Sequence, residues 1–288
     1  MGERASRLQV KPPHIFKPVL LCKKTMGEPT LSLYVDRSAA SLDIEALVRY
    51  LEGLCPHSKL KGDFFDSVGA SIEEAAVELA RCRILDLTCE GGLNLEPGAR
   101  DIEEEIAVLR SKKPLKLKEN LSNVYDGFAL AKRLKRFVKQ GLHLVFTSRM
   151  LATFEGSRYH GQTIVMDFPI ALISTTGIVE APAKPREFYI KLAAYQRARQ
   201  AGFKTPAEEG FMKDLKEEFK GRFIDYDDLR MTQVAEGYAL QAFFYLFFGE
   251  AFCENPCCRL YNAHTQEDLI RAQIKNRVLC KRHQLMLK

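Results

Sequence analysis

Hydrophobic and polar residues alternate along the chain with two periods, and each period predicts a different element. Residues 31–36 (LSLYVD) alternate and include aromatic and β-branched side chains, which is typical of a strand. After Asp43 the apolar residues recur every three or four positions, namely Ile44, Leu47, Val48, Leu51 and Leu54. This spacing predicts a helix that buries one face, directly after the strand.

The same signals continue towards the C-terminus. Ser71 and Glu74 have the spacing of a capping box and start a predicted helix over residues 71–85. Further helices are predicted over 122–138, 184–200, 207–219 and 227–250, and the last of these is the most apolar. One strand is predicted over 143–148, and two short strands are predicted within 161–175, one on each side of Asp167–Pro169. Strands interleaved with helices predict an α/β or α+β fold.

Composition along the chain indicates three parts. Residues 1–28 are basic and contain several prolines, and we expect an extended arm. Residues 29–249 hold the interleaved elements and are expected to form one α/β domain, with a helical and basic excursion at about 89–120. The cysteine-containing residues 250–288 are expected to pack on that same domain.

Composition narrows the class of protein. The 288 residues are 46% hydrophobic and 28% charged, with average glycine, proline and cysteine content, which excludes collagenous, disordered and disulfide-scaffold proteins. No apolar run approaches the roughly 20 residues that span a bilayer, and the N-terminus lacks the apolar core of a secretory signal. We therefore expect a cytoplasmic protein with no membrane partner, whose eight cysteines are reduced and available to a metal.

Positive charge is concentrated in two segments. The net charge is +6, and residues 110–140 hold ten lysines and arginines against Glu119 and Asp126. Residues 271–288 hold six such residues and no acid. Solvated helix faces explain both segments, and a nucleic-acid or ribosome-associated surface is the alternative. No aromatic and basic motif of a known nucleic-acid module lies in either segment.

Half of the cysteines and one histidine form a pattern near the C-terminus. Cys253 and Cys258 are separated by four residues, and Cys280 and His283 follow as a second short pair. Three thiolates and one imidazole suit tetrahedral zinc and leave no position open for water, which is typical of a structural site. Spacing alone leaves open whether Cys257 or Cys258 is the ligand, and buried reduced cysteines are the alternative interpretation.

A resemblance to a known family starts from these residues. The stretch FGEAFCENPCCRLYNAHTQEDL with VLCKRH after it resembles the end of archaemetzincins, which are compact zinc peptidases. In that family the catalytic helix carries HExxHxxGxxH and is followed by Cys-x4-Cys and Cys-x2-Cys. Superposing the cysteines places Cys258, Cys280 and His283 on the family's second, third and fourth positions, which favours Cys258 over Cys257. The resemblance implies a zincin-like mixed sheet with flanking helices and a C-terminal zinc knuckle.

The chain departs from that family at the catalytic helix. Counting back from Cys253, the family's catalytic positions fall on Ala242, Phe243, Leu246 and Phe252, and only Gly249 is retained. Alanine, phenylalanine and leucine neither coordinate a metal nor transfer a proton. The whole chain is more similar to an uncharacterised archaeal group, labelled as metallopeptidases, that shares RYHG, STTGIVEAPAKPREFY, RFIDYDD and CRLYNAH. We therefore predict a metallopeptidase relative that has lost the conventional catalytic site and kept a structural zinc.

Other polar residues provide candidates for a relocated catalytic site. His160 lies in a predicted hairpin, His264 precedes a predicted helix, and Glu180 and Glu267 lie near them in polar stretches. These four side chains are the types that hold a second metal or act as acid and base. Local hydrogen bonding in turns is the alternative explanation for each. Three function classes follow: an active enzyme with a relocated site, a pseudoenzyme that binds a peptide or protein, and a zinc-stabilised nucleic-acid-binding protein.

Overall fold

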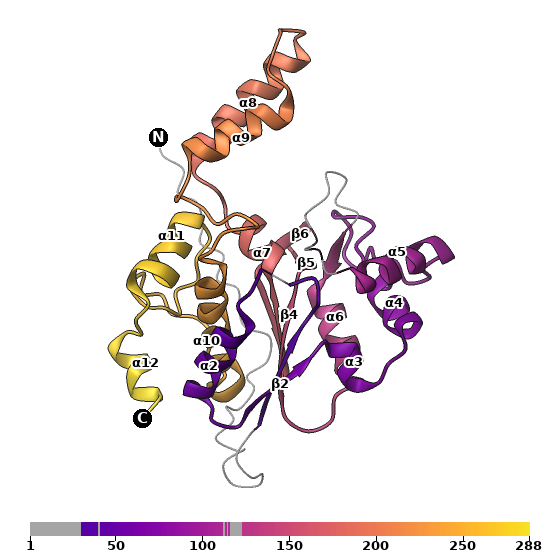
Figure 1. Cartoon of the computed structure of the whole chain (residues 1–288), viewed down its shortest axis with the longest axis vertical. Helices are drawn as coiled ribbons and strands as arrows, with labels where there is room; N and C mark the ends of the chain where they lie inside the picture. Colours follow the sequence, from indigo (N-terminus) through magenta and orange to yellow (C-terminus); the bar gives the residue numbers. More distant parts are fainter. Residues whose placement is uncertain (1–29, 40, 112, 114, 116–122) are drawn as a thin grey trace.

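A mixed five-stranded sheet forms the centre of the molecule (Figure 1). The computed structural model describes residues 30–39, 41–111, 113, 115 and 123–288; the predicted arm over 1–28 lies outside them. The strand order is β2(Ser58–Gly62), β1(Leu31–Val35), β4(Leu142–Thr147), β8(Ile170–Ser174), β7(Ile164–Asp167). The first four strands are parallel, and β7 is antiparallel to β8. Parallel and antiparallel pairing in one sheet agrees with the predicted α+β class.

A second sheet and the helices complete the fold. The small sheet has the order β3(Val124–Asp126), β5(Met150–Glu155), β6(Arg158–Gln162), and β5 and β6 form the predicted hairpin. The helices are α2(Ile44–Leu54), α3(Phe64–Val68), α4(Ile72–Ala80), α5(Ala99–Arg110), α6(Gly127–Leu134), α7(Thr175–Glu180), α8(Arg186–Gln200), α9(Glu208–Glu218), α10(Met231–Phe248), α11(Gln266–Ile270) with its π-helical continuation η2(Arg271–Asn276), and α12(Lys281–Met286).

Alternation along the central strands creates two buried faces. Leu31, Leu33 and Val35 of β1 face a core that also contains residues of α2, α7 and α10. Tyr34, between them, faces the opposite core, which α3, α4 and α6 complete. The result is a sheet with helices on both sides, because side chains of successive strand residues point in opposite directions.

Most predicted elements are confirmed, and the differences have local causes. Residues 124–126, which were expected to be helical, instead form β3, and the helix starts one residue later, where the Asp126 carboxylate accepts from the N–H of Ala129. The helix predicted over 71–85 ends at Ala80, and the most apolar helix starts at Met231 rather than at 227. Asp228, which lies just before the helix, binds Arg230.

The segment expected to form a helical excursion at about 89–120 contains α5, and a buried ion-pair network attaches this helix to the sheet. Glu105 is fully buried and accepts from Arg83 Nε (2.7 Å), Tyr125 Oη (2.6 Å) and Arg149 Nη2 (3.2 Å). Arg149 also binds Asp36 at the carboxyl end of β1 (2.9 Å). Burial raises the pKa of Asp36, although Arg149 opposes that shift. The network joins α5 to the ends of two central strands.

The C-terminal segment shares the core of the main domain. Cys258, Leu260, Leu269 and Ile270 are buried in the same cluster as the residues of α10 and β1. The pair α8 and α9 instead projects from the body (Figure 1) and has a small core of its own that includes Phe188 and Phe219. Among the described residues, none of the helices has the length and hydrophobicity that a membrane span requires.

Candidate metal centre

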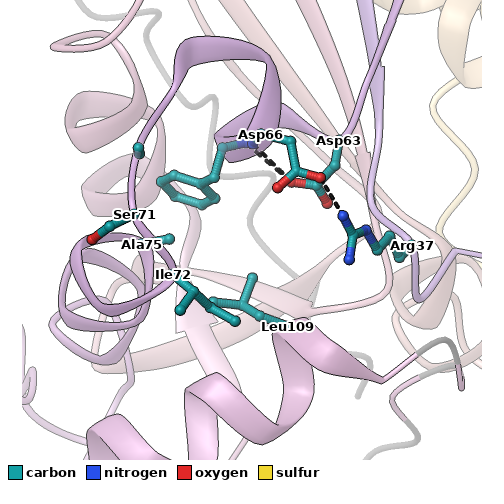
Figure 2. Close-up of a pocket in the computed structure, with 9 residues that line it drawn as sticks. Arg37, Asp63, Asp66, Ser71, Ile72, Ala75 and Leu109 are labelled. Atoms are coloured by element: carbon teal, nitrogen blue, oxygen red, sulfur yellow. Dashed lines mark hydrogen bonds and ion pairs between the residues drawn. The ribbon is translucent and has the colours of Figure 1, made fainter.

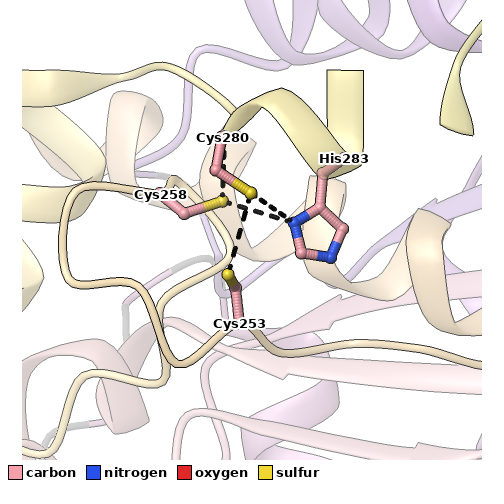
Figure 3. A group of neighbouring side chains, drawn as sticks. All are labelled: Cys253, Cys258, Cys280 and His283. Atoms are coloured by element: carbon pink, nitrogen blue, oxygen red, sulfur yellow. Dashed lines mark hydrogen bonds between the residues drawn. The ribbon is translucent and has the colours of Figure 1, made fainter. Parts of the chain in front are cut away.

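The four residues predicted to bind zinc lie together in the structure (Figure 3). One potential ligand atom from each of Cys253, Cys258, Cys280 and His283 lies within 4.8 Å of all the others. The Sγ atoms of Cys253 and Cys280 are 3.9 Å apart, and His283 Nδ1 lies 3.7 Å from Cys258 Sγ and 3.0 Å from Cys280 Sγ. Tetrahedral zinc with bonds of about 2.3 Å to sulfur and 2.0–2.1 Å to nitrogen separates its ligand atoms by about 3.6–3.8 Å. The donor types and the separations of 3.9 and 3.7 Å suit this ion, whereas the distance from Nδ1 to Cys280 Sγ is shorter.

Backbone hydrogen bonds bring the two ligand pairs together. The N–H of Cys253 donates to the carbonyl of Leu260, which closes the turn containing Cys258. The N–H of Arg259 donates to the carbonyl of Val278, and this bond holds the two ligand-bearing segments side by side. Cys280 is the N-cap residue of α12, so His283 follows within the first turn of the helix and its side chain returns towards the sulfur atoms.

The thiols differ in how readily they ionise. Burial opposes ionisation of Cys280, but hydrogen bonds from the backbone N–H and the imidazole of His283 lower the pKa of its thiol to about 7. Burial raises the pKa of the Cys258 thiol to about 11, although the N–H of Cys280 donates to its sulfur at 3.3 Å. A metal cation is the partner that holds such a buried sulfur as thiolate, because metal binding releases the proton.

Cys257 and Cys258 occupy different environments, although spacing alone treats them as equivalent. Cys258 is fully buried and its sulfur faces Cys280 and His283. Cys257 is exposed and is absent from the ligand group. The geometry thus agrees with the choice that the resemblance favoured. Of the other four cysteines, Cys55 and Cys82 are buried, Cys89 is exposed, and Cys22 lies outside the described residues.

The apolar helix α10 forms core at Ala242, Phe243 and Leu246, three of the positions onto which the resemblance maps catalytic residues. Ala242 and Leu246 are fully buried, and Phe243 is 5% exposed. Phe243 packs against Phe247 with ring centroids 4.3 Å apart. Within the part of the chain that the structure describes, α10 contributes no residue to a group of three or more potential metal ligands.

The four candidates for a relocated catalytic site have separate local partners. His160 pairs with Thr153 across the β5–β6 hairpin, and the carbonyl of the exposed His264 accepts from the N–H of Ala183. The Glu180 carboxylate binds Lys184 at 3.0 Å, and that of Glu267 binds Arg222 at 2.7 Å. Among the described residues, the group at the C-terminus is the one set of three or more potential ligands, and it contains none of these four. A shared site remains a prediction.

Cations of both basic segments take part in ion pairs. In the first segment Arg133 binds Glu78, and Lys135 binds Asp167. In the second, Arg277 binds Glu236 and Arg282 binds Glu250. These pairs give the cations an intramolecular role. Binding of nucleic acid, a peptide or a protein also remains a prediction.

A cleft beside the central sheet is lined by α3, α4 and α5 (Figure 2). It contains about 60 Å³ of water-accessible space. Its polar side chains already have partners: Asp66 binds Arg37 at 2.5 Å, Asp63 accepts from the first N–H groups of α3, and Ser71 caps α4. The cleft is small, and its polar groups are those that hold the surrounding helices in place.

One carboxylate beside the metal centre was not predicted from the sequence. Glu250 accepts from Nε2 of His283 at 3.2 Å, and its second oxygen accepts from Arg282 at 2.6 Å. Its position three residues before Cys253 was the available signal, but many surface glutamates lie as close to a cysteine in sequence. The contact depends on how α10 ends, which spacing does not reveal.

Comparison with known proteins gives one match. A family model described as "Probable metallopeptidase family" matches residues 28–288. No curated protein and no solved structure matches the chain significantly. The match spans the sheet, α10 and the four clustered ligand residues together.

Proposed function

The chain belongs to this Probable metallopeptidase family, and from that premise we propose that it is a zinc protein whose zinc is structural and whose α10 no longer performs peptidase chemistry. The observation that carries the proposal is the cluster of Cys253, Cys258, Cys280 and His283. Four protein ligands saturate tetrahedral zinc, whereas a catalytic zinc keeps a position for water or substrate. Zinc bound at these residues would cross-link the end of the chain, and no reaction step passes through it.

Location supports a structural role. Cys258 and His283 are fully buried, and Cys258 belongs to the same core cluster as α10. The ligands come from two segments separated by more than 20 residues, so zinc would restrain the α11–η2 region between them. Because such sites rarely exist in the unfolded chain, metal binding adds directly to the free energy of folding.

The loss of peptidase chemistry is supported by the composition of α10. A zincin needs two imidazoles one helical turn apart and a glutamate between them. Here the corresponding side chains are buried and apolar. Restoring the ligands would place polar groups into close-packed core, which is unfavourable without partners.

Metal content of matched cysteine variants tests the zinc assignment. Protein purified without chelator should contain one zinc per chain, Cys258→Ser should lose it and unfold at lower temperature, and Cys257→Ser should keep it. The neighbouring cysteines differ in burial but have the same chemistry, which makes Cys257 the appropriate control. Stoichiometric zinc in a Cys253→Ala, Cys258→Ala double variant would contradict the assignment.

A peptidase assay tests the second half of the proposal. The zinc-loaded protein should release no peptides from casein above the rate of a heat-denatured sample. Chelator-sensitive hydrolysis that disappears in His160→Ala or His264→Ala would contradict it and would favour a relocated site. An equal background rate in all samples is the expected result.

A further inference from the structure

The end of α10 places a carboxylate against the only histidine of the proposed zinc centre. Gly249 ends the helix in the left-handed conformation (φ 72°), and its N–H donates to the carbonyl of Tyr245. The following residue, Glu250, leaves the helix axis there and reaches His283, with Oε1 at 3.2 Å from Nε2. The His283 ring also packs edge-on against Phe244 of α10, with centroids 5.4 Å apart.

The two nitrogens of His283 face different partners. Nδ1 lies 3.0 Å from Cys280 Sγ and 3.7 Å from Cys258 Sγ, on the side of the clustered sulfur atoms. A nitrogen that binds a metal carries no proton, so the proton of the neutral ring must be on Nε2. Nε2 of this fully buried residue then donates to Glu250, which is an acceptor in the required position.

We infer that Glu250 is the positioning residue of the zinc centre: it accepts the Nε2–H of His283 and so fixes Nδ1 as the nitrogen that faces the metal. The inference rests on the proposed zinc site and assigns a role to a residue outside the ligand set. Histidine ligands commonly donate their second N–H to a carboxylate, which orients the ring and increases its basicity. The pair also couples the end of α10 to the C-terminal ligands.

A third residue holds the carboxylate in place. Arg282 Nη2 donates to the other oxygen of Glu250 at 2.6 Å. The Glu250 side chain is 27% exposed, whereas that of Arg282 is 67% exposed, so water can replace the arginine more readily than it can replace the glutamate. We therefore expect Arg282→Ala to have a smaller effect than a change of Glu250.

Zinc affinity of variants at Glu250 and Glu254 tests the inference. Glu254 is exposed, lies next to Cys253 and carries the same charge, but it is outside the hydrogen-bond network, so its variants are the matched control. Competition with a chromophoric chelator should show affinity 10–100-fold lower for Glu250→Ala than for Glu254→Ala, the usual effect of losing such a partner. Glu250→Gln should lie between them, because its amide oxygen still accepts the proton while its charge is lost.

A spectroscopic readout separates positioning from general destabilisation. In the zinc-loaded full chain, nitrogen NMR of His283 should show a slowly exchanging proton on Nε2 that Glu250→Gln keeps and Glu250→Ala loses to solvent exchange. If Glu250→Ala does not fold, the comparison of Glu250→Gln with Glu254→Gln decides, with weaker zinc binding expected for the former.

The outcomes distinguish this inference from the proposal on which it rests. Zinc bound by the parent and equally tightly by the Glu250 and Glu254 variants would overturn the role of Glu250 and leave the zinc centre standing. A proton on Nδ1 in the zinc-loaded chain would also overturn it. A parent chain that binds no zinc would overturn both.

Discussion

Replacing Glu105 by glutamine tests whether the buried ion-pair network attaches α5 to the sheet. Glutamine keeps the size of the side chain and the helix propensity, but it removes the charge. Glu105 is fully buried and accepts three hydrogen bonds, two of them from the guanidinium groups of Arg83 and Arg149. It is also the one residue of α5 with a fully buried side chain, and Glu104 and Leu109 of the same helix provide further contacts with Arg83 and the core.

The expected loss of stability in Glu105→Gln depends on which partners Arg83 and Arg149 keep. Removing one member of a buried ion pair costs about 3–5 kcal/mol, because a charge is left without compensation. Here Arg149 keeps Asp36 at 2.9 Å, and Arg83 keeps Glu104 at 3.0 Å. The glutamine oxygen also retains part of the hydrogen bonding. We therefore expect a loss near the lower end, about 3 kcal/mol in the free energy of unfolding.

Urea unfolding of zinc-loaded protein measures this loss, with Glu103→Gln as the control. Glu103 is exposed on the same helix, and its substitution should change stability by less than about 0.5 kcal/mol. Amide hydrogen exchange in α5 should also become faster in Glu105→Gln, because the attachment of the helix to the sheet is weakened. A stability difference of less than about 0.5 kcal/mol between the two variants would refute the reasoning.

Three further predictions concern the core. Burial lowers the pKa of His143 from its ordinary 6.5 to about 4, so this imidazole takes up its proton at a higher pH in the unfolded chain than in the folded one. The free energy of unfolding therefore falls by up to about 3 kcal/mol as the pH drops from about 6.5 to about 4. His143→Phe should flatten the dependence of the unfolding free energy on pH, and an unchanged slope would contradict this. Leu246→Ala should cost about 2–5 kcal/mol in a urea titration, and Leu229→Ala, 98% exposed, should cost less than about 0.5 kcal/mol; equal losses would place α10 outside the core. A Cβ at Gly237 would lie 1.6 Å from Gln273 Oε1, so Gly237→Ala should lower the melting temperature, whereas Gly53→Ala, in open space on α2, should raise it.

Elements whose burial follows from local pattern could be predicted from the sequence. The strand at Leu31–Val35 and the helix after Asp43 appear at the expected positions, since their apolar period matches the core they face. The short strand Val124–Asp126 was missed because its pairing partner, β5, lies some 25 residues further along the chain. Three residues carry too little periodicity to indicate a strand without that partner.

The candidate site also contains residues that the sequence pattern indicates and residues that it does not. Paired short spacings bring Cys253, Cys258, Cys280 and His283 into one hypothesis, and the fold places their ligand atoms together. Glu105 and Glu250 are different, because each gains its role from an arginine or histidine brought close by tertiary structure. An acidic block such as 101–105 ordinarily indicates a solvated helix face, and nothing in its spacing marks the one buried carboxylate.

X-ray absorption at the zinc edge tests the central claim most directly, because it reports the ligands of the bound metal. On this chain purified without chelator, we expect one zinc per chain, surrounded by three sulfur atoms at about 2.3 Å and one nitrogen at about 2.0–2.1 Å. The zinc signal should be lost in Cys258→Ser, and the spectrum should remain unchanged in Cys257→Ser. A shell of nitrogen and oxygen ligands with a bound water would contradict a structural centre at these four residues.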